Sequence, residues 1–326
     1  MQVVIDILEN ELIQKYPDVL GILLRDQTTQ KNIFWATDNY EHRGDSYKFN
    51  SEILPDLITG ENGNVIMPRV HKDKTLQLSR SKEMAEVFTP SWICNTQNNL
   101  VDNSWFGTDG VFNKEIVLKN GSKSWETTKE KIVFPKGKTW QDYVRDTRLE
   151  ITCGEAPYLV SRYDTTTGEF ITIENRIGLL DRKLRVVNEN LDSKNEWLKA
   201  VETAYKNTYG FEWQGDSLLL AREALLITFI ENFTYKFETE PTLETIQKIA
   251  QIISWNIWQM DGLKGVIPNS CKDEIVEVSD FFETKTEIKK CKGCATQNIK
   301  LHNGIYCTIM DWDIEKPIKF ISLLEK

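Results

Sequence analysis

From Arg148 onward, short runs of apolar residues alternate with longer segments whose apolar residues recur at helical spacing. Apolar residues at every third or fourth position are typical of an amphipathic helix, whereas short apolar runs between turn residues are typical of strands. Strands that alternate with helices indicate βαβ units and a parallel sheet. This feature restricts the fold most, because right-handed crossovers place ligands at the carboxyl ends of the strands.

The expected elements can be given by residue number. Strands are predicted at 148–152, 209–213, 255–261 and 304–310, and helices at 182–191, 195–209, 216–235 and 241–253. Upstream, the pattern predicts helix within 1–25, a pair of strands at 21–26 and 32–38, an irregular β-rich layer over 40–85, a helix with an Asn-rich face at 91–102, and loops over 103–147. We therefore expect an N-terminal α+β extension at 1–85 and an α/β domain at 86–326.

Composition excludes some classes of protein. The chain has no run of about 18 apolar residues, so no membrane span is expected. Its N-terminus is acidic and lacks the basic region of a secretory signal, which predicts a cytoplasmic location. A net charge of −9 means that any contact with nucleic acid must come from a local patch. Residues 176–185 gather four cations that could touch phosphates, or could form a solvated helix face.

Three stretches fall in an order that suits an adenosine-containing ligand. They are AEVFTPSWICNTQNN at 85–99, RLEITCGEAPYL at 148–159 and YGFEWQGDSLLLAREALL at 209–226. A turn after the first strand lets the backbone approach the ligand, and an acid at the end of the second strand can accept both ribose hydroxyls. Glu212 holds that second position, although a solvated acid at a strand end would give the same pattern.

These stretches resemble the amino-methyltransferases of DNA restriction–modification systems, in particular the adenine-N6 enzymes of type I and type IIG. The family has a Phe-Thr-Pro element, matched by residues 88–90, and a motif Asp-Pro-Ala-Cys-Gly-Ser-Gly, whose places are taken by residues 150–156. Cys153 and Gly154 match that motif. Glu150 replaces its Asp, Glu155 brings a second charge, and Ala156 replaces its last Gly.

The resemblance implies a Rossmann-like sheet that binds S-adenosylmethionine (SAM) and transfers its methyl group to adenine N6 of DNA, in a restriction–modification or phage-defence setting. Gly154 would permit close approach of the methionine end, Glu212 would bind the ribose and Asp261 the adenine of the cofactor. The cofactor-binding residues implied are Phe88, Thr89, Pro90, Glu150, Thr152, Cys153, Gly154, Glu155, Glu212 and Asp261.

The chain departs from the family where catalysis is expected. The family signature of Asp or Asn, two prolines and an aromatic residue is missing. Asp311 and Trp312 follow the predicted strand 304–310 and offer an acceptor and a ring for a flipped base, or are ordinary turn residues. Few residues follow them, so the sheet is expected to be incomplete at its C-terminal side and to be completed by a partner chain or the N-terminal residues. The alternative is a catalytically inactive binding or assembly module.

Cysteines cluster near the C-terminus. Cys291 and Cys294 form a Cys-Lys-Gly-Cys knuckle, whose spacing lets two thiolates reach one zinc ion. Cys271 and Cys307 could complete a four-cysteine site, and His302 could replace one of them. The sequence thus predicts a zinc knuckle inserted at 271–307, with reduced, partly buried thiols as the alternative.

Overall fold

A small parallel sheet lies at the centre of the molecule. The computed structural model describes residues 9–72, 89–279 and 284–325. Strands β3 (Arg148–Ile151), β4 (Thr208–Glu212) and β5 (Ile257–Gln259) are adjacent in that order, and all three run parallel. The chain is therefore a mixed α/β protein. The sheet has three strands in the part of the chain that the structure describes, and no complete Rossmann fold is identified there.

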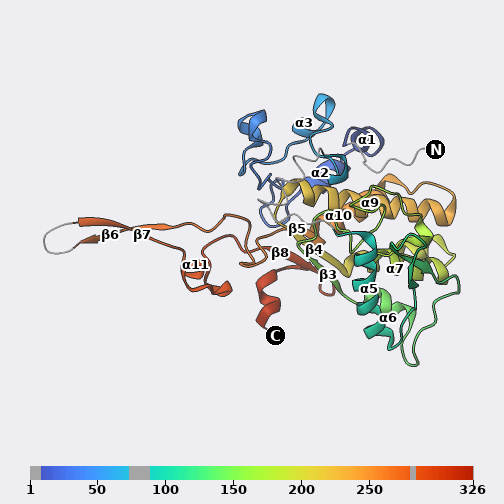
Figure 1. Ribbon diagram of the computed structural model, residues 1–326. Helices are drawn as coiled ribbons and strands as arrows, with labels where there is room; N and C mark the ends of the chain where they lie inside the picture. The colour runs from blue at the N-terminus through green and yellow to red at the C-terminus, as the bar shows by residue number, and fades with distance from the viewer. Residues whose placement is uncertain (1–8, 73–88, 280–283, 326) are drawn as a thin grey trace.

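Two helices connect each pair of strands, as the alternation of patterns predicts. Helices α7 (Leu179–Asn190) and α8 (Lys194–Lys206) join β3 to β4, and α9 (Gly215–Phe237) and α10 (Leu243–Asn256) join β4 to β5. Thr242 caps α10 by accepting a hydrogen bond from the Thr245 N–H. Helix α9 is buried over most of its length, because neighbouring helices contact it on several sides (Figure 1).

The N-terminal part packs on this unit and differs from its prediction. Residues 19–24 form helix α2 instead of a strand, and only one isolated bridge, Arg25 to Asn32, remains of the expected strand pair. The apolar residues of α2 are buried against α10, and this packing outweighs their strand-like run. The other elements are α1 (Glu9–Lys15), α3 (Pro55–Ile58) and the 3-10 turns η1 (Glu41–Arg43), η2 (Asp45–Tyr47), η3 (Gly60–Asn62) and η4 (Arg69–His71). The predicted β-rich layer is absent from the described residues up to 72.

A side-chain amide fastens the N-terminal part to the end of the sheet. The Gln259 amide donates to the Phe34 carbonyl at 2.8 Å and accepts from the Phe34 N–H at 3.1 Å, which imitates a strand neighbour. The Gly215 N–H donates to the Trp35 carbonyl at 3.0 Å, and the Trp213 indole to the Ala36 carbonyl at 3.2 Å. One cluster of buried apolar side chains accordingly runs from the N-terminal helices to β5.

The segment between the N-terminal part and β3 is more ordered than predicted. Helix α5 (Ser91–Phe106) confirms the helix expected at 91–102. Residues expected to be loops form a hairpin of β1 (Asn113–Val117) and β2 (Lys123–Thr127) and helix α6 (Trp140–Arg145). Aromatic rings gather here with centroids 4.7–6.5 Å apart, and they join this segment to the main apolar core. The rings belong to Trp105, Phe106, Phe112, Phe134 and Tyr143.

The C-terminal segment leaves the sheet. Strands β6 (Glu274–Ser279) and β7 (Thr284–Lys289) form a hairpin that extends away from the body (Figure 1). Helix α11 (Lys292–Thr296) and the turn η6 (Ile299–Leu301) follow. Strand β8 (Thr308–Asp311) confirms the last predicted strand, but it pairs antiparallel with β9 (Lys316–Lys319) and does not join the parallel sheet. The turn η7 (Phe320–Glu325) ends the described chain.

Candidate functional site

A cavity of about 1040 Å³ opens at the carboxyl ends of β3 and β4. The turn after β3, the turn after β4, one side of α5 and two residues of the N-terminal part form its walls. This is where a parallel sheet places ligands, because successive strands end there in loops. The lining residues are Ala36, Phe49, Thr89, Gln97, Asn98, Val101, Leu149–Glu155, Pro157, Tyr158, Leu179, Glu212, Trp213, Gln214 and Ser217.

The turn after β3 has an unusual backbone. Thr152, Gly154 and Ala156 all have positive φ, at 50°, 52° and 61°. Only glycine adopts this region without strain, so the two other residues are held there by their surroundings. The Cys153 N–H donates to the Phe211 carbonyl at 2.9 Å, which carries the pairing with β4 into the turn. The turn is thus a shaped edge of the cavity.

Glu212 ends β4 and organises both turns. One carboxylate oxygen accepts from the Gly154 N–H at 2.8 Å. The other accepts from the N–H groups of Trp213 and Gln214 at 2.9 and 3.2 Å. Burial raises the pKa of Glu212, and these hydrogen bonds partly offset the effect. The structure therefore brings together the two motifs that the sequence predicted to meet.

Glu150 is a buried carboxyl group that faces the same cavity. Its side chain accepts one long hydrogen bond, from the Tyr158 N–H at 3.4 Å, and its second oxygen has no partner among the described residues. Burial raises the pKa of Glu150 well above its usual range. Glu155 and Glu212 also line the cavity, whereas no Lys or Arg of the described residues does. A buried carboxyl group with an unpaired oxygen, as Glu150 has among the described residues, favours a ligand that carries positive charge.

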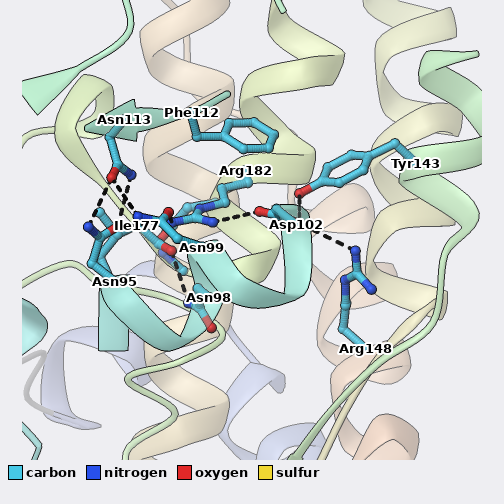
Figure 2. A network of polar contacts seen from close by, with 12 residues as sticks. Asn95, Asn98, Asn99, Asp102, Phe112, Asn113, Tyr143, Arg148, Ile177 and Arg182 are labelled. Atoms are coloured by element: carbon cyan, nitrogen blue, oxygen red, sulfur yellow. Dashed lines mark hydrogen bonds and ion pairs between the residues drawn. The ribbon is translucent and has the colours of Figure 1, made fainter. Parts of the chain in front are cut away.

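A network of buried polar side chains fixes α5 beside the cavity (Figure 2). Arg182 of α7 pairs with Asp102 at 2.6 Å and donates to the side-chain carbonyl oxygens of Asn95 and Asn99 at 2.9 and 2.8 Å. Asn98 donates to the Tyr158 and Ile177 carbonyls, both at 3.0 Å. The Asn-rich face of α5 therefore serves packing, and Asn98 also lines the cavity together with Gln97 and Val101.

The basic segment 176–185 has a different role from either one expected. The side chains of Arg176 and Arg182 are each 1% exposed, and Lys183 is fully buried. Lys183 donates to the carbonyls of Asp146 and Asn207, and Arg176 pairs with Glu231. Neither phosphate contact nor a solvated face fits buried, paired cations, so that reading of the segment was wrong. The apolar periodicity of α7 did not indicate that these cations are buried.

The remaining cofactor-side predictions divide into two groups. Thr89 lines the cavity, and Pro90 directly precedes α5. Phe88 lies outside the described residues. Asp261 follows β5, but its carboxylate pairs with Lys264 at 2.9 Å and accepts from the Leu263 N–H at 3.1 Å. It is not among the residues that line the cavity.

Asp311 and Trp312 do not lie beside the cofactor-side residues. The Trp312 indole donates to the Asn256 side chain at 2.8 Å, and Asn256 also donates to the Tyr205 carbonyl in α8 and to the Thr208 carbonyl at the start of β4. Both residues line a separate cavity of about 730 Å³ at this amino end of the strands. Their expected position at the carboxyl edge is corrected, because β8 pairs with β9 and does not extend the parallel sheet.

The cysteine cluster is real, but its fourth member is His302. Cys271, Cys291, Cys294 and His302 bring their ligand atoms within 4.8 Å of one another, so this group could hold a metal such as zinc. Cys307, expected as a ligand, instead donates to the Gln259 carbonyl at 3.4 Å and packs in a small apolar cluster around β5. Cys307 directly precedes β8 and lies beside β5, so its thiol is kept away from the cluster.

Comparison with known proteins gives no relative. No protein-family model matches the chain, and neither a curated protein nor a solved structure matches it. Among the described residues, no helix combines the length and the apolar character needed to cross a membrane. Function must therefore be argued from the geometry of the cavity.

Proposed function

We propose that the chain binds SAM in the cavity at the ends of β3 and β4, as a SAM-dependent methyltransferase-like protein. The buried carboxyl group of Glu150, one of whose oxygens has no partner among the described residues, carries this proposal. A buried acid without a cation is costly, and a ligand that brings positive charge removes the cost. SAM has a sulfonium and an ammonium group, so it suits a cavity lined by three glutamates.

The shape of the site supports the same ligand. Glu212 ends the second strand, where an acid can accept a ribose hydroxyl, and the oxygen that accepts from the Gly154 N–H has a further lone pair to offer. Trp213 and Phe49 add apolar rings to the cavity wall, against which an adenine can pack. The volume of about 1040 Å³ is ample for a ligand of this size. In this proposal the parallel sheet is the recognisable part of a Rossmann-like methyltransferase core.

The proposed reaction is methyl transfer to adenine N6 of DNA, in a restriction–modification or phage-defence setting. The exocyclic nitrogen would attack the methyl carbon, the carbon–sulfur bond would break, and the proton displaced from nitrogen would pass to an acceptor or to water. The target base must leave the helix to reach such a cavity. The support for this step is the resemblance of the motifs at 88–90, 150–156 and 209–226.

A second candidate is a cofactor-binding module without catalysis. The position of Asp311 and Trp312 at the amino end of the strands favours it, since they lie away from the cofactor-side residues. A protein partner is proposed in either case. Strand β3 is an edge of the sheet in the described chain, and Leu149 and Ile151 on it are 43% and 67% exposed. An added strand would pair with the open backbone edge of β3, beside these two side chains of the cavity wall.

Calorimetry tests the cofactor. SAM should bind more tightly than S-adenosylhomocysteine, because the demethylated product lacks the sulfonium charge that the acids favour. The reverse order, or no heat with either ligand, contradicts the proposal. Transfer of radiolabelled methyl groups to DNA then separates the two candidates. Incorporation would establish the enzyme, and bound SAM without incorporation would favour the binding module.

A further inference from the structure

The cysteine and histidine cluster has the dimensions of a tetrahedral metal site. His302 Nδ1 lies 3.5 Å from Cys271 Sγ, 3.7 Å from Cys291 Sγ and 3.6 Å from Cys294 Sγ. Zinc bonds of about 2.3 Å to sulfur and about 2.0–2.1 Å to nitrogen at tetrahedral angles require a sulfur-to-nitrogen edge of about 3.5 Å. The three measured edges agree with that value, so one ion fits between all four atoms.

The surroundings hold the imidazole in this position. A Cβ added at Gly293 would lie 2.6 Å from His302, so the knuckle approaches the ring closely because residue 293 is glycine. The backbone N–H of His302 donates to the Tyr306 hydroxyl at 2.9 Å, and that hydroxyl donates to the Ile299 carbonyl at 2.8 Å. These contacts fix the backbone from which the imidazole reaches the three thiols.

Asn303, which follows His302, joins its own segment to the other two ligand-bearing segments. Its side chain accepts from the Lys272 N–H at 3.1 Å and donates to the Lys272 carbonyl at 2.8 Å. Its own N–H donates to Cys291 Sγ at 3.3 Å, a contact that stabilises a thiolate. The chain therefore prepares the site with hydrogen bonds beyond the four ligands.

We propose that Cys271, Cys291, Cys294 and Nδ1 of His302 bind one Zn²⁺ as a closed structural site. Four protein ligands fill a tetrahedral ion and leave no place for water or substrate, which distinguishes a structural zinc from a catalytic one. Three thiolates exclude Mg²⁺ and Ca²⁺, which prefer oxygen ligands. The site is separate from the cofactor cavity and does not depend on the proposed function.

The ion would fasten the hairpin β6–β7 to the body. The hairpin begins shortly after Cys271 and ends shortly before Cys291, so these two cysteines lie at its base. His302 belongs to the segment that leads back to the sheet, where the Ile267 N–H donates to the Ile305 carbonyl at 2.8 Å. Binding energy at the ion then becomes folding energy of residues 271–303.

Metal analysis of the full chain, purified without added metal, tests the proposal. Wild type should contain about one zinc per chain, as a closed site requires. Cys294→Ser should lose it, whereas the matched control Cys307→Ser should retain it, because Cys307 is buried outside the cluster. Zinc retained in full by Cys294→Ser, or folded wild type without zinc, would overturn the proposal.

X-ray absorption of the zinc in wild type keeps the test independent of how a variant folds. The first shell should contain three sulfurs at about 2.3 Å and one nitrogen at about 2.0–2.1 Å. A shell of four sulfurs would overturn the assignment of His302, and oxygen ligands would overturn the closed site. Limited proteolysis after chelation should give cleavage within 271–303 at least about tenfold faster, and an unchanged rate would contradict the fastening role.

Discussion

The residues that matter most to the proposed function are acids without cations. Glu150 is 8% exposed, and one of its oxygens has no partner in the described chain. Glu212 is equally buried, but three backbone N–H groups satisfy it. The two acids therefore differ: Glu212 shapes the turns, whereas Glu150 keeps an oxygen that could bind the proposed ligand.

Replacing Glu150 by glutamine should have opposite effects on binding and stability. Glu150→Gln should weaken SAM binding by about 1.5–3 kcal/mol, the value of a hydrogen bond to a charged group. It should also stabilise the ligand-free protein by about 1 kcal/mol, because an unpaired buried acid is removed. Calorimetry and urea unfolding measure the two quantities. A loss of both affinity and stability would indicate a role in packing.

Affinity for SAM should rise with pH. Burial raises the pKa of Glu150 in the folded chain, so below that pKa the folded protein holds a proton that the unfolded chain has already released. The free energy of unfolding of the ligand-free protein therefore falls as pH rises from the ordinary glutamate range to the raised pKa. A cation binds the ionised form, so affinity rises over the same window. Calorimetry in buffers of different ionisation enthalpy should detect proton release.

Replacing Glu212 should affect both SAM affinity and stability, because its carboxylate does more than contact a ribose. Glu212→Ala removes the acceptor of the Gly154, Trp213 and Gln214 N–H groups, so it should weaken SAM binding by at least about 1–3 kcal/mol and destabilise the fold as well. Titration and thermal unfolding of the variant give both values. Unchanged affinity would place the ribose elsewhere.

At the scale of elements, the position of α5 depends on one buried arginine. Arg182 reaches from α7 to Asp102 and two asparagines of α5 (Figure 2). Helix α5 supplies part of the cavity wall, and its Asn98 holds the turn after β3. The network therefore fixes the position of α5 relative to the edge of the sheet at which the cavity lies.

Removing that arginine should be strongly destabilising. Arg182→Met leaves the Asp102 carboxylate buried with weaker partners and should cost about 3–5 kcal/mol, the range for breaking a buried ion pair. The exposed Arg145 offers a matched control, and Arg145→Met should change stability by less than about 0.5 kcal/mol. Urea unfolding measures both. Equal effects would mean that the network contributes nothing specific.

At the scale of the whole molecule, the N-terminal part completes the cavity. Ala36 and Phe49 line it, although they precede the sheet by about a hundred residues of chain. Their position depends on Gln259, whose amide binds both backbone groups of Phe34 and the Trp213 carbonyl. Sheet, turn and N-terminal segment meet at this single side chain.

Truncating Gln259 should loosen the wall. Gln259→Ala leaves part-buried backbone groups of Phe34 and Trp213 unpaired and should cost about 1–3 kcal/mol of stability, with weaker SAM binding. Gln251→Ala, on an exposed face of α10, is the control and should change neither quantity appreciably. Thermal unfolding and titration decide. If Gln259→Ala binds SAM normally, the N-terminal part is not needed for the site.

Helices and strands that depend on neighbouring residues could be predicted from local sequence patterns. The periodicity of 182–253 predicted α7 to α10, and the short apolar runs predicted β3, β4, β5 and β8, because helical and strand patterns are set within a few residues. The meeting of the turn after β3 with Glu212 also followed, since parallel strands end at a common edge.

Features that depend on residues far apart in the sequence could not be predicted in this way. Most of the run predicted as a strand at 21–26 belongs to helix α2, because its apolar side chains pack against α10. Cations of the segment 176–185 are buried because carboxylates and backbone carbonyls accept their hydrogen bonds. Spacing could not choose between Cys307 and His302, since both follow the knuckle at a similar distance. The fold distinguishes them, because Cys307 is buried against β5 while Gly293 leaves room for the His302 ring beside the knuckle.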